Sequence, residues 1–307
     1  MSVKKRRNFL LDDNNVGSKT NDNSEGTNDF IINKYRTEQI NITRIENDVK
    51  SHSQLKKEYV VALNLKSKKA KVNLNDLYYD FKPPVLSKVY EFVSKTEAIR
   101  NNVNFTIDKN GKLSKITNKK DIFTNWIAFK NKDIHDLEFI KTLKNKNKSE
   151  FYNIVKQGDI QFDVSNKNSE LDYQRDLFFL VLFDKHLIFD LKSIPTESYD
   201  FKSQLFPQVS VPMKIRYDLI KEDDETMTIR KVAEGEINDE LIKKIEEQYN
   251  KLHKPMIHYQ FSQYKLTYRV RYEVNKITRV INNAELTIIE NVENNIESTC
   301  KYSLFKL

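Results

Sequence analysis

The residue types in this 307-residue chain that could bind a metal ion or carry acid–base chemistry are five histidines and many carboxylates. On a helix, His135 and Glu138 would share one face, and His253 and His258 lie on either side of a proline-containing turn. Neither pair supplies the three or four ligands that a zinc site needs. We therefore expect no metal site, no cofactor and no catalytic residue.

The single cysteine, Cys300, lies two and four residues before Tyr302 and Leu304 in an alternating stretch. This spacing predicts a small buried side chain in a strand, because a nucleophilic thiol would need a neighbouring histidine. One cysteine also excludes an intrachain disulfide framework and a cysteine-rich zinc module. The acidic run 222–225 lies between two alternating stretches, which predicts a solvated hairpin turn.

Glycine is scarce: only five occur, and the closest two are Gly17 and Gly26. The dinucleotide fingerprint, the phosphate loop and the nucleophile elbow all require glycines within about six residues of each other, so all three are excluded. Because no catalytic constellation is recognisable, we expect that the protein is not an enzyme. An active site of unrecognised type is the open alternative.

Positive charge is concentrated in the middle of the chain. Residues 51–157 hold 22 Lys and Arg residues against 11 Asp and Glu, and the only arginine among them is Arg100. The lysines that we expect to face a partner are Lys66, Lys68, Lys69 and Lys71. Phosphate recognition usually adds arginine forks and flat aromatic platforms. We therefore expect a protein partner with an acidic surface, and nucleic-acid binding is an alternative.

Residues 1–30 are rich in Asn, Asp, Ser and Lys and contain few apolar side chains. Such a segment cannot bury enough apolar surface to offset its ordering entropy, so we predict a disordered polar tail. The start of the sequence turns acidic too early for a signal peptide, and no apolar run reaches the roughly 18 residues of a membrane span. We expect a cytoplasmic protein without a membrane span.

The segment 31–157 is predicted to hold strands and then helices. The predicted strands are 59–65, 70–74, 88–93, 103–107 and 112–116. The first two and the last two should form hairpins, the latter with a type I′ turn at Asn110-Gly111. Apolar residues then recur every three or four positions, which predicts two or three helices across 119–157 that end at Gly158.

The segment 158–307 is predicted to be mostly antiparallel sheet, because long runs alternate apolar and polar residues. Its predicted strands are 186–191, 213–219, 226–232, 266–274, 277–289 and 298–305. Residues 169–183 predict a buried helix, although 178–183 could equally be a strand. Residues 238–252 predict an amphipathic helix capped by Asn238. The tyrosines predicted to line the concave face of the sheet are Tyr217, Tyr268 and Tyr272.

These elements predict an α+β fold: a large curved antiparallel sheet, half-barrel-like or an incomplete barrel, with helices packed on or beside it. A closed barrel is the alternative. The predicted organisation is a polar tail, 1–30, a basic unit of strands and helices, 31–157, and a sheet-rich unit, 158–307.

Two stretches carry a resemblance. They are the hairpin FTIDKNGKL, residues 105–113, and the passage from Phe206-Pro207 through Val211-Pro212-Met213-Lys214 into an alternating strand. Over roughly residues 55–305 the chain resembles the lipoprotein-carrier-like open half-barrel proteins of bacteria. This resemblance implies an open half-barrel with helices along one side and a hydrophobic ligand in the concavity. Those proteins carry an export signal, and this sequence departs from them there.

The expected function is that of a non-enzymatic bacterial binding protein acting through contacts with another protein. It would be an adaptor, an immunity-type protein or an assembly component, for example of a secretion or phage-tail-like system. Carriage of a hydrophobic ligand in the concavity of the sheet is the first alternative. Nucleic-acid binding through the lysine-rich middle segment is the second.

Overall fold

The computed structural model describes residues 5–8 and 30–307. Within these residues the strands form one twelve-stranded sheet in which every neighbouring pair is antiparallel. The strands are β1 (Lys5–Asn8), β2 (Ile31–Ile45), β3 (Asp48–Asn64), β4 (Lys69–Lys82), β5 (Asn102–Ile107), β6 (Leu113–Ile116), β7 (Glu197–Lys202), β8 (Ser210–Glu222), β9 (Thr226–Gly235), β10 (Tyr264–Asn275), β11 (Ile281–Val292) and β12 (Ile296–Lys306).

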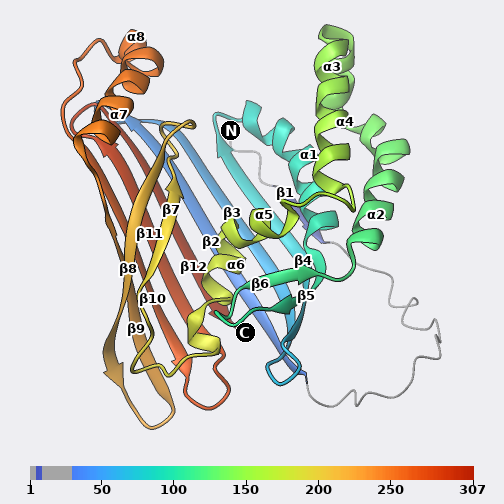
Figure 1. Cartoon of the computed structure of the whole chain (residues 1–307). Coiled ribbons are helices and arrows are strands. Elements are labelled where there is room, and N and C mark those ends of the chain that lie inside the picture. Colours follow the sequence, from blue (N-terminus) through green and yellow to red (C-terminus); the bar gives the residue numbers. More distant parts are fainter. Residues whose placement is uncertain (1–4, 9–29) are drawn as a thin grey trace.

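Helices accompany the sheet on its inner side and at its corners (Figure 1). They are α1 (Val85–Arg100), α2 (Lys119–Asn131), α3 (Glu138–Lys146), α4 (Lys148–Phe162), α5 (Ser169–Arg175), α6 (Leu177–Leu182), α7 (Asp239–Leu252) and α8 (Lys254–Ile257), with 3₁₀ turns η2 (Asp133–Asp136) and η3 (Lys185–Leu187). The predicted α+β class with a large, open antiparallel sheet is confirmed.

The strand order is β6-β5-β4-β3-β2-β12-β11-β10-β9-β8-β7, and β1 adds to β4 off this path. The middle of the sheet is therefore the β2–β12 ladder, which joins strands from opposite ends of the sequence. An ion pair of 2.7 Å between Arg44 and Glu297 crosses this ladder. The two predicted units, 31–157 and 158–307, thus share a single sheet.

Alternation along the strands decides which residues form the core. On β10, Tyr268, Val270 and Tyr272 are buried, whereas Arg269 and Arg271 between them are exposed. Because successive side chains of a strand point to opposite faces, the apolar set faces the helices and the charged set faces solvent. The inner face of the curved sheet is therefore apolar over most of its width.

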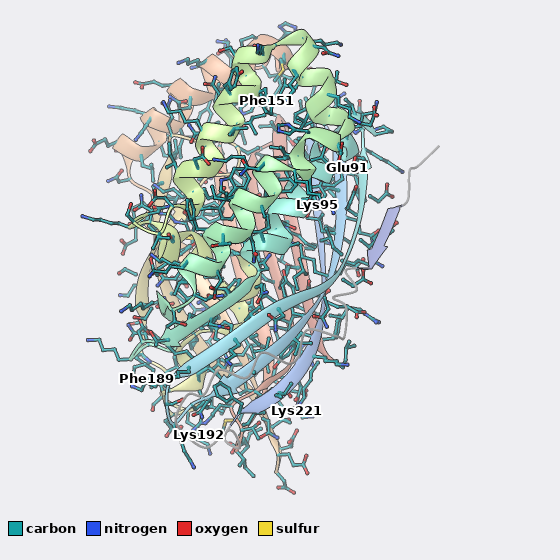
Figure 2. All side chains as sticks on the ribbon, turned by 90° about the vertical axis from the view of Figure 1, so that its right-hand side faces the viewer. Glu91, Lys95, Phe151, Phe189, Lys192 and Lys221 are labelled. Carbon is teal, nitrogen blue, oxygen red and sulfur yellow. The ribbon has the colours of Figure 1, made fainter. Side chains whose placement is uncertain are left out.

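Helices α2, α3 and α4 pack together over one side of the molecule (Figure 2). Gly158, predicted to end a helix, lies inside α4 instead. The reason is packing: a Cβ atom on Gly158 would lie 2.2 Å from Cζ2 of the fully buried Trp126. The Trp126 indole N–H donates to Asp159 at 2.8 Å, which fixes the ring against this glycine.

The inner face is covered by the chain itself. Residues 177–196, which we call the inner segment, comprise α6, η3 and the stretch that leads to β7 (Figure 1). Its buried side chains include Phe178, Phe179, Val181, Leu182, Phe183, Leu187, Leu191 and Ile194. The concavity is therefore filled by apolar groups of the protein over this region.

Two predicted strands are wrong. Residues 88–93 belong to α1, which follows Pro84 in a helical conformation and buries Tyr90 and Ser94 one turn apart. Residues 186–191 form the end of η3 and an irregular stretch; Leu187 and Leu191 are buried, whereas Ile188 is exposed. Short apolar runs do not distinguish these cases by periodicity.

The β5–β6 hairpin is confirmed, but its turn differs from the predicted type I′. Only Gly111 has a positive φ, of 81°, whereas a type I′ turn needs two such residues. The loop is closed by Asp108, whose carboxylate accepts the N–H groups of Asn110 at 2.7 Å and Lys112 at 2.9 Å. The loop therefore presents Lys112 at the edge of the sheet.

The predicted polar tail, residues 1–30, lies largely outside the described residues. Of its described residues, Lys5–Asn8 form β1, which pairs with β4, and Phe30 directly precedes β2. Within the described residues no helix is long and apolar enough to cross a membrane.

Candidate functional site

The two outer strands of the sheet, β6 and β7, approach each other across the inner segment. On the β6 side, α5 protects the strand edge: the Gln174 amide donates to the Leu113 carbonyl at 2.6 Å, and the Glu170 carboxylate accepts the Ile116 N–H at 3.2 Å. Capping of this kind removes the free hydrogen-bonding groups of an edge strand. We call the region between β6 and β7 the seam.

A pocket of 220 Å³ opens at the seam. Its apolar wall comes from α6 and the two strands, with Phe179, Leu180, Phe183, Leu113 and Tyr199. Its polar lining includes Lys112, Gln174, Arg175, Ser198 and Asp200. The seam pocket is therefore amphipathic, with one apolar side and a rim that carries two cations, Lys112 and Arg175, one carboxylate, Asp200, and uncharged hydrogen-bonding groups.

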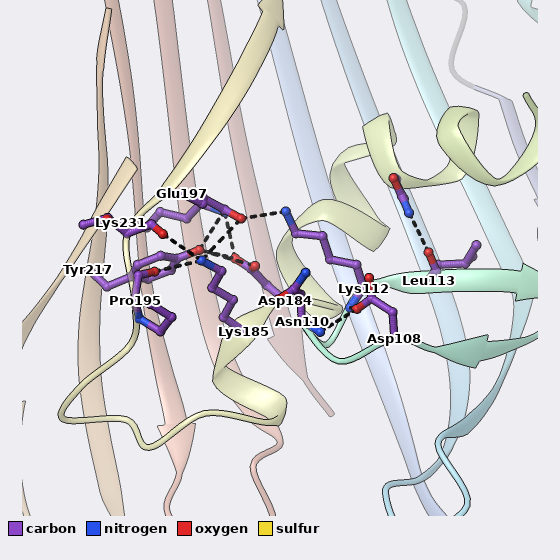
Figure 3. Close-up of polar contacts among 12 residues, drawn as sticks. Asp108, Asn110, Lys112, Leu113, Asp184, Lys185, Pro195, Glu197, Tyr217 and Lys231 are labelled. Atoms are coloured by element: carbon purple, nitrogen blue, oxygen red, sulfur yellow. Dashed lines mark hydrogen bonds and ion pairs between the residues drawn. The ribbon is translucent and has the colours of Figure 1, made fainter. Parts of the chain in front are cut away.

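A buried group of charged side chains lies directly beside the seam pocket (Figure 3). We call it the ion cluster, and its members are Lys112, Asp184, Lys185, Glu197, Tyr217 and Lys231. Lys231 on β9 contacts Asp184 at 2.7 Å and Glu197 at 3.3 Å. Lys112 reaches Glu197 at 2.8 Å, so one side-chain contact connects the β5–β6 hairpin with β7.

Burial and ion pairing oppose each other within the cluster. Burial alone would raise the pKa of Asp184, but the charge and hydrogen bond of Lys231 outweigh it and hold that pKa below its usual value. In Lys231, burial lowers the pKa and the charge of Asp184 raises it, with a net increase well above the usual value. Both groups are therefore ionised at neutral pH, and each depends on the other because a lone buried charge is costly.

The cluster is not electrically balanced. Three ammonium groups, those of Lys112, Lys185 and Lys231, are joined by these contacts to two carboxylates, those of Asp184 and Glu197. Lys185 also donates to the carbonyl oxygens of Pro195 at 2.8 Å and Thr196 at 3.1 Å, which carry no formal charge. The cluster thus holds one net positive charge beside an apolar pocket.

His186 extends the cluster into the core. Its ring is fully buried, 5.3 Å from the ring of Tyr272, and neither ring nitrogen has a hydrogen-bond partner among the described residues. The pKa of His186 is lowered to about 4, mainly by burial; Asp184 opposes this decrease, and Lys231 and Arg279 add to it. The imidazole is therefore neutral in the folded protein at neutral pH.

A pH-dependent loss of stability follows from His186. Unfolded histidine binds a proton below about pH 6.5, whereas the folded ring binds one only below about pH 4. The free energy of unfolding should therefore fall by about 3 kcal/mol from pH 6.5 to pH 4 on account of this residue. Urea unfolding of His186→Phe across this range should show a smaller fall than the parent chain. The control is His135→Gln at an exposed site, which should lose as much unfolding free energy between pH 6.5 and pH 4 as the parent chain. The same loss in His186→Phe as in the parent chain would contradict the proposal that His186 causes it.

A second charged group lies on the other side of α6. Lys57 pairs with Glu97 at 3.0 Å, and Arg100 pairs with Asp176 at 3.2 Å. A cavity of 160 Å³ adjoins them, lined also by Tyr59 and other residues of the sheet and α6. Here each cation has one carboxylate partner. The Lys57–Glu97 pair joins β3 to α1, and the Arg100–Asp176 pair joins α1 to the start of α6, so we assign this group a structural role.

The structure separates the predicted site residues. Tyr217 belongs to the ion cluster, where its hydroxyl donates to Glu197 at 2.9 Å. Tyr268 and Tyr272 lie on the inner face, as the alternation predicts, and are covered by the inner segment and β7. The predicted partner-facing lysines, Lys66, Lys68, Lys69 and Lys71, are exposed around the β3–β4 hairpin, away from the seam pocket.

Cys300 and the acidic run 222–225 have structural roles. Cys300 is buried, and burial raises the pKa of its thiol to about 11. The acidic run 222–225 forms the β8–β9 turn, with Glu222 paired to Lys276 at 2.9 Å. In the part of the chain that the structure describes, no group of three or more His, Cys, Asp or Glu residues could hold a metal ion.

The sequence analysis missed the ion cluster, although one signal was present. On β9 the inward positions run Met227, Ile229, Lys231 and Ala233, so a lysine occupies an apolar position of the alternation. A charge at such a position indicates a buried partner. The partner itself, Asp184, lies in an irregular segment and has no sequence signal of its own.

Comparison with known proteins gives few matches. No family model matches the chain, and no curated protein matches it. A solved structure titled "Lipid-protein interactions in lipovitellin" is similar in fold to a limited degree, with a TM-score of 0.44 and 11% sequence identity over 90% of this chain. This chain spans 25% of that lipovitellin chain. The resemblance to bacterial lipoprotein carriers stays a prediction.

Proposed function

We propose that the protein binds a small anionic amphiphile, such as a medium-chain carboxylate, in the seam pocket and does not transform it. The observation that carries this proposal is the contact between an apolar pocket and an ion cluster with one unbalanced positive charge. An acyl chain would lie against the apolar wall, and its carboxylate would supply the missing negative charge near Lys112.

The volume of the pocket limits the ligand. Pockets that enclose drug-sized ligands measure about 300–1,000 Å³, and the seam pocket has 220 Å³. A short or medium acyl chain fits such a space, whereas the rest of the concavity is filled by the inner segment. We therefore propose the seam pocket as the site at which the protein would carry a ligand. A ligand could contact Tyr268 or Tyr272 only after displacing the inner segment.

The rim offers a second cation. Arg175 on α5 lines the pocket, is exposed, and forms no ion pair within the described part of the chain. Guanidinium binds a carboxylate through two parallel N–H groups. Arg175 is therefore placed to select an anionic headgroup, while Lys112 is already engaged with Glu197 at 2.8 Å.

Octanoate binding tests the proposal by calorimetry. Each methylene moved from water into an apolar site contributes about 0.8 kcal/mol, so the dissociation constant should fall about tenfold from hexanoate to octanoate. Arg175→Gln should weaken octanoate binding about tenfold, and Arg175→Lys should restore part of it. Ser198→Trp should abolish binding, because Ser198 is exposed and lines the pocket, so that the indole ring would fill it.

Uncharged octanol is the matched control ligand. It has the same chain length, so any loss of affinity relative to octanoate measures the headgroup alone. Equal affinities for octanol and octanoate, or octanoate binding that survives Ser198→Trp unchanged, would contradict an anion-selective site at the seam.

A further inference from the structure

Exposed lysines cover the outer face of strands β4 to β6 near the β3–β4 hairpin. Lys69 and Lys71 alternate with the buried Ala70 and Val72, so both lysines point outward. Lys69 pairs in register with Thr106 of β5, which pairs with Lys115 of β6. We call this surface the basic face, and its lysines are Lys66, Lys68, Lys69, Lys71, Lys109 and Lys115.

The basic face has no acidic side chain of its own. No aspartate or glutamate occurs in residues 59–75, 102–107 or 109–118. The other outward side chains are uncharged hydrogen-bonding groups, such as Asn73 and Asn104. Lys69 and Lys71 pair with Asn64 and Ala62 of β3 and with Thr106 and Asn104 of β5, so neither lysine lies opposite a carboxylate.

Elsewhere on the outer surface of the sheet, charges are paired across strands. Arg36 contacts Glu58 at 2.6 Å, and Arg230 contacts Asp218 at 2.8 Å. In contrast, no ion pair to Lys69, Lys71 or Lys115 is formed by any carboxylate in residues 5–8 and 30–307. The positive charges of Lys69, Lys71 and Lys115 are thus not balanced by a carboxylate of the described residues.

We propose that the basic face is the docking surface for an acidic surface of another protein. Lysine ammonium groups are compact and strongly hydrated, and they attract carboxylates as point charges. The face contains no arginine, and the one ring that the structure places against its lysines is the half-buried Phe30, 5.7 Å from the Lys71 ammonium. Arginine forks and exposed aromatic platforms are the groups that usually bind phosphate and stack on bases. Lys69 and Lys115 lie two strands apart, about 10 Å, close to the spacing of carboxylates two turns apart on a helix, about 11 Å.

Polyglutamate peptide is the probe, and its affinity is measured with the full chain by fluorescence anisotropy at about 50 mM salt. The triple variant Lys69→Glu/Lys71→Glu/Lys115→Glu should raise the dissociation constant at least tenfold. The matched control, Lys243→Glu/Lys244→Glu/Lys251→Glu on exposed positions of α7, makes the same change in net charge and should alter it less than threefold. Carbodiimide cross-linking followed by mass spectrometry should place the peptide on Lys69, Lys71 and Lys115.

Three outcomes would overturn the proposal. One is equal weakening by both triple variants, because the attraction would then follow net charge alone. Another is cross-linking to lysines outside the basic face. The third is tighter binding of duplex DNA or RNA than of the peptide at about 150 mM salt, lost in the basic-face variant, which would make the partner a nucleic acid. The octanoate measurement concerns a different surface, so either proposal can fail without the other.

Discussion

Replacing Lys231 by methionine is expected to lower the free energy of unfolding by about 3–5 kcal/mol. The change removes the ammonium group that lies 2.7 Å from Asp184 and 3.3 Å from Glu197. Glu197 keeps its contact with Lys112 at 2.8 Å, whereas the buried carboxylate of Asp184 loses the ion pair that the structure shows for it. Breaking a buried pair by removal of one partner costs this much because the remaining charge is not solvated. Urea unfolding monitored by circular dichroism measures the change.

A double-mutant cycle separates the pair from simple loss of packing. The double variant Lys231→Met/Asp184→Asn should lose clearly less unfolding free energy than the sum of the losses in the two single variants. In the double variant both charges of the pair are gone, so neither remains buried without its partner. Lys221→Met on the exposed end of β8 is the control and should change stability by no more than about 0.5 kcal/mol. Additive single effects would show that Lys231 and Asp184 are not coupled.

Replacing Gly111 by alanine is expected to cost about 3 kcal/mol and to open the seam. The φ of 81° is unfavourable for an L-residue by about 1–2 kcal/mol. A Cβ atom there would also lie 2.1 Å from the carbonyl oxygen of Asp184, which belongs to rigid backbone. The β5–β6 loop must therefore withdraw, and Lys112 loses its contact with Glu197 at 2.8 Å.

Two measurements on Gly111→Ala test this expectation: the midpoint of urea unfolding and the affinity for octanoate, both of which should fall. Gly235→Ala is the matched control, because its Cβ would meet side chains and no backbone, those of Ile237 at 3.2 Å and Val211 at 3.6 Å, and its φ is not positive. A loss of stability in Gly111→Ala without any loss of octanoate affinity would show that the loop does not shape the seam pocket.

Alternation made much of the sheet predictable from sequence. The strand 266–274 and the helix 238–252 were correct because their apolar periods, two and about 3.6, were clear, and Asn238 caps α7 by accepting the Leu241 N–H at 2.9 Å. A short apolar run is compatible with either a helix or a strand, and contacts with residues outside the run decide which of the two forms. Residues 88–93 and 186–191 failed for that reason.

Strand β2 was not predicted because its inward positions, apart from Tyr35, are polar. These polar inward positions are Asn33, Thr37, Gln39 and Asn41, and the apolar residues Ile40 and Ile42 stand at the outward positions of a short stretch. The apolar signal that marks a strand is absent there. The ion cluster was missed for a related reason: its members come from five separate elements or loops, and only the fold brings them together.

The central position of the β2–β12 ladder constrains how the chain can reach this fold. Arg44 and Glu297, paired across the ladder, are 253 residues apart in sequence. Closing a contact of such separation early is entropically costly, so this pairing is expected late and slowly. During synthesis on the ribosome, β2 would therefore present an unpaired edge until β12 emerges, and such an edge invites pairing with other chains. We therefore expect chaperones to bind the nascent chain at this stage, while the edge of β2 is unpaired.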